Sequence, residues 1–173
     1  MENNTYFKLS KSKINGLFIY FGILLIIGIL ASLFAVNYEM FSCKLSITLL
    51  SLIGGFGTAL LGSSIFYMRK LYKSAINDSL TEPSTKKEKI NETGLFFYYF
   101  LRPVFAVVFS LLIHIGLKAS VAIVTVKESE LDSGMIYLTM IISFFIGFSA
   151  GDVLTKLETI SKDIADKSID KLT

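Results

Sequence analysis

The chain of 173 residues is 53% hydrophobic and only 18% charged, with a formal net charge of +3 at pH 7. Soluble domains carry about 25% charged residues, so this composition favours a protein surrounded by lipid. The single cysteine excludes an intrachain disulfide, and one His with one Cys cannot build a metal site.

Four runs of the sequence are long and apolar enough to cross a bilayer, whose core of about 30 Å requires roughly 20 residues of helix. These runs are residues 14–36, 45–68, 95–124 and 135–154. The first run is longer than the apolar region of a signal peptide, so we expect it to remain as a permanent span. The sequence therefore predicts an all-α fold, an integral membrane four-helix bundle.

The Lys and Arg residues are distributed very unevenly among the segments that flank these runs. One side of the predicted topology receives 14 of the 17 basic residues, which lie in residues 1–13, 69–94 and 155–173 and at Arg102. The short segments 37–44 and 125–134 and Lys118 hold the rest. By the positive-inside rule, we predict a multi-pass protein of the bacterial inner membrane with both termini in the cytoplasm.

The cytoplasmic segments allow more than one interpretation. Residues 69–94 form either a solvated connector or a docking surface for a protein or anionic lipid. In residues 155–173, apolar side chains continue the spacing that starts at Leu154 and Leu157, which predicts an amphipathic helix. Its apolar stripe is covered by other copies of the chain, by a soluble partner, or by packing back onto residues 69–94.

Small residues four apart predict where helices pack closely, because association in lipid depends on close approach of backbones. The helix-packing candidates are Ser51, Gly55, Ala59 and Ser63 in the second run and Gly147 and Gly151 in the fourth. The first run has few such residues, and we expect it to lie at the periphery.

The third run carries the polar chemistry of the membrane region. Ser110, His114 and Lys118 share one helical face, and His114 lies too deep to reach water. In one interpretation His114 is a neutral imidazole that hydrogen-bonds Thr58 or Ser143 at similar depth. In the other, this face lines a hydrated path and His114 titrates near its ordinary pKa of about 6.5.

Two further charges in the spans lie near the same predicted membrane surface. Arg102 and Asp152 enter this leaflet from the third and fourth runs, so we predict an ion pair that fixes helix register. Arg102 can alternatively extend to water, as can Lys118 at the opposite surface.

No enzymatic centre is predicted, since the spans hold no pair of carboxylates and no phosphate-binding glycine loop follows a strand. We also expect no cofactor and no direct nucleic-acid binding.

Several short blocks resemble a group of small bacterial four-span inner-membrane proteins of unassigned activity. These blocks are GGFG at 54–57, RKLY at 69–72, YYFLRP at 98–103, GFS at 147–149 and LE at 157–158. In size and topology the chain also resembles the membrane component of the Kiwa phage-defence system. That resemblance implies a homo-oligomer that holds a soluble DNA-binding partner at the inner membrane.

We therefore expect a non-enzymatic oligomer that acts as a membrane sensor, anchor or pore-type effector in anti-phage defence, with a soluble cytoplasmic partner. A stand-alone ion channel or small-solute transporter is the alternative, and a structural or assembly subunit is a third possibility.

Overall fold

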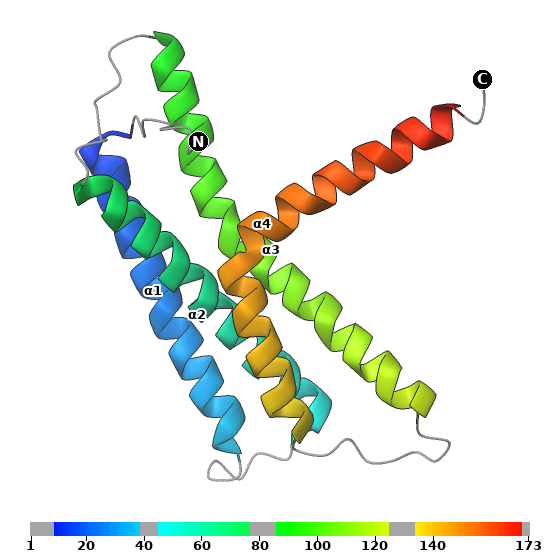
Figure 1. Cartoon of the computed structure of the whole chain (residues 1–173). Helices are drawn as coiled ribbons and strands as arrows, with labels where there is room; N and C mark the ends of the chain where they lie inside the picture. Colours follow the sequence, from blue (N-terminus) through cyan, green and yellow to red (C-terminus); the bar gives the residue numbers. More distant parts are fainter. Residues whose placement is uncertain (1–8, 39–44, 77–85, 125–133, 171–173) are drawn as a thin grey trace.

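The computed structural model describes residues 9–38, 45–76, 86–124 and 134–170, and nearly all of these residues are helical, with no strand among them. The helices are α1 (Lys11–Val36), α2 (Ile47–Ile76), α3 (Lys86–Val124) and α4 (Gly134–Asp170). They pack as a bundle from which parts of α3 and α4 diverge (Figure 1). The all-α prediction and the four-helix arrangement are confirmed.

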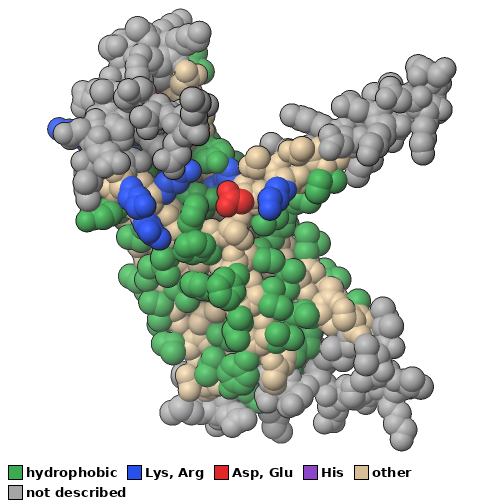
Figure 2. All heavy atoms as spheres, in the orientation of Figure 1, with side chains coloured by type: hydrophobic (Ala, Val, Ile, Leu, Met, Phe, Trp, Pro, Cys, Tyr) green, Lys and Arg blue, Asp and Glu red, His purple; other side chains and the backbone are tan. Residues whose placement is uncertain are grey.

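Each helix contains a stretch that is long and apolar enough to cross a membrane. These stretches are Lys11–Val36, Ile47–Lys73, Lys89–Ser120 and Gly134–Ser161. Apolar side chains cover much of the outer surface of the bundle, as lipid contact requires (Figure 2). Length, composition and surface together indicate a multi-pass membrane protein.

One end of the bundle, which we call the basic end, gathers nearly all the described basic side chains. It contains the start of α1, the end of α2, the first part of α3 and the point where α4 leaves the bundle (Figure 1). The described Lys and Arg residues of this end are Lys11, Lys13, Arg69, Lys70, Lys73, Lys89, Arg102 and Lys156. Several form a band at the border of the apolar surface (Figure 2).

The α2 and α4 helices approach one another at the level of their backbones. A Cβ atom built on Gly147 would collide with the carbonyl oxygen of Ala59, and one on Gly62 would collide with that of Phe144. No side chain fits between these segments, so glycine is required on both helices. Among the predicted packing residues, Ser51, Ala59 and Ser63 are fully buried on the same helix.

The α1 helix lies against α2 through a second glycine contact. A Cβ atom on Gly28 would lie 2.7 Å from the carbonyl oxygen of Gly57. Elsewhere α1 exposes large apolar side chains such as Ile19 and Leu30. This peripheral position is the one expected of a lipid-facing helix.

An aromatic and aliphatic cluster joins three helices at the basic end. Leu17 and Phe21 of α1 are buried there against Tyr67 of α2 and Tyr99 of α3. The Phe21 and Tyr67 rings are stacked with centroids 6.0 Å apart, and Tyr67 meets Tyr99 edge-on at 5.8 Å. The cluster fixes α1 where the helix would otherwise contact lipid alone.

The α4 helix is assigned continuously to Asp170 but bends sharply where it leaves the bundle, and its last part projects away from the other helices (Figure 1). In this projection Leu157 and Ile160 are 47% and 52% exposed. The side chains of residues 162–170, which continue the predicted amphipathic stripe, lie outside the described residues.

Candidate functional site

A row of buried side chains on α3 faces α2 and α4. Arg102, Ala106, Ser110 and His114 are all at most 5% exposed and follow one another at steps of four residues. Lys118, the next residue of the series, is exposed. The predicted polar face of α3 is therefore interior from Arg102 to His114 and leaves the interior at Lys118. We call these four buried residues the polar row.

His114 contacts α2 through Ser51, with Nδ1 of the ring 3.1 Å from the serine Oγ. The Ser51 hydroxyl also donates to the carbonyl oxygen of Thr48, at 3.0 Å. A single hydroxyl hydrogen serves one acceptor at a time, so this geometry favours an N–H at Nδ1 that donates to Ser51. Nε2 is then the acceptor nitrogen, and it is buried with no hydrogen-bond partner in the described part of the chain.

The partners proposed for His114 from the sequence are engaged elsewhere. Thr58 donates within its own helix, with Oγ1 3.1 Å from the carbonyl oxygens of both Gly54 and Gly55. Ser143 lies 2.8 Å from Ser110, Oγ to Oγ. Membrane depth estimated from position in the sequence could not decide whether Ser51 or Thr58, two turns further along α2, lies opposite His114.

The Ser110–Ser143 pair lies beside Gly55 of α2. A Cβ atom on Gly55 would lie 3.0 Å from Oγ of Ser110 and 3.2 Å from Oγ of Ser143. Because Gly55 has no side chain, there is space beside α2 for the hydrogen bond between the hydroxyl groups of Ser110 on α3 and Ser143 on α4. Nearby Thr139 is fully buried, and its Oγ1 has no partner among the described residues.

At the basic end, the polar row terminates in a buried guanidinium. Arg102 is 5% exposed, and its Cζ lies 4.0 Å from the centroid of the Tyr98 ring, a cation–π distance. Its Nη1 is buried without a partner among the described residues. No ion pair within the described ranges joins Arg102 to Asp152, which is exposed.

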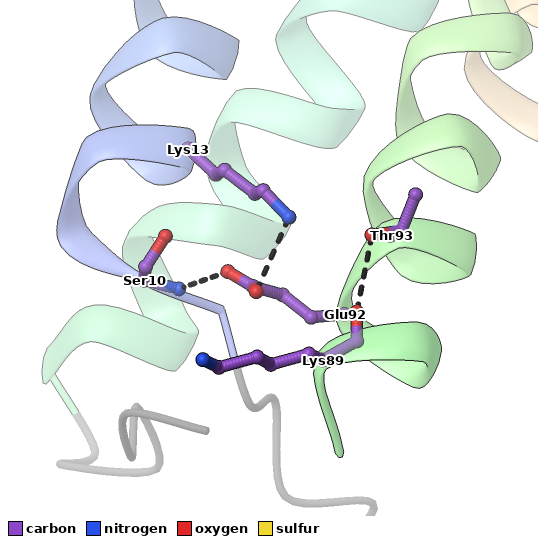
Figure 3. Close-up of polar contacts among 5 residues, drawn as sticks. All are labelled: Ser10, Lys13, Lys89, Glu92 and Thr93. Carbon is purple, nitrogen blue, oxygen red and sulfur yellow. Dashed lines mark hydrogen bonds and ion pairs between the residues drawn. The ribbon is translucent and has the colours of Figure 1, made fainter. Parts of the chain in front are cut away.

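A second charged contact lies at the start of α1 and was not predicted (Figure 3). Ser10, the N-cap residue, donates its backbone N–H to Oε1 of Glu92 on α3 at 2.8 Å, and Lys13 Nζ lies 3.2 Å from Oε2. The first turn of α1 contains no acidic residue, so Glu92 supplies the negative charge that a helix N-terminus favours. The absence of an acidic residue from the first turn of α1 is the sequence feature that could have indicated such a partner.

An apolar cavity of about 300 Å³ lies beside α2 and α4. It is lined by Thr58, Tyr137, Met140, Ile141, Phe144 and Phe145. With no charged group in this lining, the cavity suits a hydrocarbon chain or an apolar side chain.

In the described ranges, no three His, Cys, Asp or Glu residues cluster closely enough to hold a metal ion. No protein-family model, curated protein or solved structure matches this chain.

Proposed function

We propose that the chain is a non-enzymatic, oligomeric protein of the bacterial inner membrane that holds a soluble protein partner at the cytoplasmic surface during anti-phage defence. The observation that carries this proposal is the projection of α4, where Leu157 and Ile160 are about half exposed beyond the bundle. In the proposed topology the membrane span of α4 ends at Leu154, so these apolar side chains lie in the cytoplasm, where they favour a partner surface. The defence setting rests on the resemblance to the Kiwa membrane component.

The charge distribution supports a cytoplasmic position for this projection. The basic end and the projection lie at the same end of the bundle, and basic residues accumulate on the cytoplasmic side of bacterial membrane proteins. The start of α3 also belongs to this end, so two helices can meet the partner.

Orientation is tested by thiol labelling of intact cells. Cys43 and Ser84, both outside the described residues, lie in segments of opposite predicted sides. An impermeant maleimide should label Cys43 in intact cells. In a Cys43→Ser, Ser84→Cys variant, it should react only after lysis. The reverse pattern would contradict the proposed orientation.

Partner binding is tested with matched substitutions on the projection. Leu157→Ser with Ile160→Ser removes the exposed apolar groups, whereas Thr155→Ser with Thr159→Ser changes neighbouring exposed positions conservatively. The first pair should abolish co-purification of a defined soluble protein from the native host without affecting membrane insertion. The second should retain it. Equal recovery with both pairs would exclude this stripe as the docking surface.

A channel is the second candidate function, and it is favoured by the unpaired polar atoms of the interior. Nε2 of His114 and Oγ1 of Thr139 have no partner in the described structure, and water in a hydrated path would satisfy both. The proposal of an anchor predicts that purified protein in liposomes leaves a pH-sensitive dye gradient intact. A leak that His114→Asn abolishes would favour the channel instead.

A further inference from the structure

We infer that Arg102, Tyr67 and Gly151 form a binding site for a phosphate group at the basic end, with an anionic lipid headgroup as the expected source. This inference does not depend on a cytoplasmic partner or on defence. It concerns a charge that the described residues compensate only in part.

The first step concerns the cost of burying Arg102. A guanidinium is always protonated, and a buried charge is tolerated when it is paired and hydrogen-bonded. Arg102 is 5% exposed, it lies over the face of the Tyr98 ring and interacts electrostatically with the Tyr67 side chain, and Nη1 has no hydrogen-bond partner among the described residues. A cation–π contact compensates only part of this cost.

The second step concerns the shape around Nη1. Tyr67 Oη is also buried without a hydrogen-bond partner in the described ranges. A Cβ atom on Gly151 would lie 2.7 Å from Nη1 of Arg102 and 2.9 Å from Oη of Tyr67. Arg102 of α3 and Tyr67 of α2 therefore lie side by side against one stretch of α4 backbone, where the phenol oxygen can accept from the guanidinium and keep its own hydrogen for a ligand. A phosphate oxygen can accept hydrogen bonds from both.

The third step concerns the ligand and its route. Tyr98, over which the guanidinium lies, is 45% exposed, and Asp152 beside Gly151 is exposed, so the donors lie just beneath the surface. The site belongs to the basic end, where exposed aromatic side chains such as Phe97 and Tyr98 indicate the depth of lipid headgroups. Anionic headgroups bind basic pockets between membrane helices at this depth.

The Gly151→Ala variant provides the test, because it changes the shape of the site and keeps every charge. The added methyl group would meet only the ends of two long side chains, which can move, so the bundle should still assemble. Gly116→Ala is the matched control, since its Cβ atom would have no neighbour within 4 Å. Arg102→Lys retains a charge but lacks the planar donor fork.

The experiment measures thermal unfolding of the full chain in neutral detergent against added phosphatidylglycerol, phosphatidylcholine or inorganic phosphate. Phosphatidylglycerol should stabilise the wild type and Gly116→Ala alike, and phosphatidylcholine should have little effect. Gly151→Ala and Arg102→Lys should bind phosphatidylglycerol roughly tenfold more weakly, as expected for the loss of a charge-assisted hydrogen bond. Equal binding by wild type and Gly151→Ala would reduce the effect to general attraction by basic residues and overturn the site.

Two further measurements distinguish a lipid ligand from free phosphate, and a phosphate site from an Arg102–Asp152 ion pair. Stabilisation by millimolar inorganic phosphate that competes with phosphatidylglycerol would support the site with a free anion as its ligand, whereas no effect of phosphate supports the lipid. Asp152→Asn removes a nearby negative charge and should tighten phosphatidylglycerol binding a few-fold. If Asp152→Asn instead destabilises the lipid-free protein and leaves lipid binding unchanged, an Arg102–Asp152 ion pair is the correct account and the phosphate site is wrong.

Discussion

The α2–α4 and α3 interfaces of this bundle are built in different ways. Where α2 meets α4, glycine allows backbone to touch backbone, as at Gly147 and Ala59. The α3 helix instead reaches its neighbours through side chains, by the Tyr67–Tyr99 ring contact at the basic end and by the Ser110–Ser143 and Ser51–His114 contacts further along. Beyond His114, α3 presents Lys118 to its surroundings.

The two interfaces represent the two ways in which helices can associate in lipid. Lipid gives no hydrophobic drive for helix association, so a pair of helices is held by close packing or by hydrogen bonds. Backbone contact depends on the absence of a side chain and has no tolerance for a larger one. Side-chain contacts are individually weak and can be exchanged. We therefore expect α2–α4 to form the rigid part of the molecule and α3 to be the helix whose position is adjustable.

The largest effect is expected for Gly147→Leu. Its side chain would have to occupy the space of the Ala59 carbonyl, so α2 and α4 must separate. The loss of stability should reach at least about 3 kcal/mol, the upper end for overpacking. Thermal unfolding in detergent and gel filtration measure it. Gly116→Leu, at an open position of α3, should unfold like the wild type. A Gly147→Leu protein of normal stability would refute the backbone contact.

Much of the fold was predictable because the length of the apolar runs indicates the helices and the spacing of small residues indicates where they pack. The packing positions Ser51, Gly55 and Ala59 are buried on α2 as expected of a packing ridge. Gly57, which receives α1, was not predicted, since its partner Gly28 lies on a helix with few small residues. Gly57 also meets Ser32, four residues after Gly28, but a series of only two small residues is too short to predict a contact from spacing alone.

An intermediate effect is expected for Glu92→Ala, which tests how α3 is attached to α1 outside the apolar part of the bundle. The substitution leaves the Ser10 N–H and Lys13 without their acceptor (Figure 3). Loss of a charged acceptor should lower the free energy of unfolding by about 1–2 kcal/mol. We expect the lower end of this range, because Lys13 is partly exposed and solvent weakens the ion pair. Hydrogen exchange should accelerate in the first turn of α1. Asn91→Ala, at the exposed neighbouring position, should leave exchange unchanged.

The candidate site was predictable in its residues and less so in its pairings. Spacing placed Ser110 and His114 on one face, because steps of four residues follow the helix surface. It could not select Ser51 as the partner of His114, since helix crossing and relative height depend on the glycine contacts between helices. Glu92 was missed for a related reason: its role depends on the end of α1, far away in the sequence.

A smaller effect is expected at His114. His114→Leu removes the contact with Ser51 and should cost about 1 kcal/mol, the scale of one polar contact between membrane helices. His114→Asn can still bond Ser51 and should unfold close to the wild type. Thermal unfolding of both variants measures the difference. Equal destabilisation by Asn and Leu would mean that the shape of the imidazole, rather than its hydrogen bond, holds α3.

The smallest effect is expected for the Ser110–Ser143 pair, and it bears most directly on whether α3 is adjustable. A double-mutant cycle of Ser110→Ala and Ser143→Ala should give a coupling energy of about 0.6 kcal/mol, the average for hydrogen bonds between membrane helices. Ser149 provides the control, because its hydroxyl donates to Phe145 of its own helix at 2.8 Å and should not couple to Ser110. A coupling above about 2 kcal/mol would make α3 as firmly fixed as α4 and would remove the contrast between the two interfaces. A value near 0.6 kcal/mol leaves α3 held by several weak contacts, so a ligand at Arg102 can change its position at modest cost.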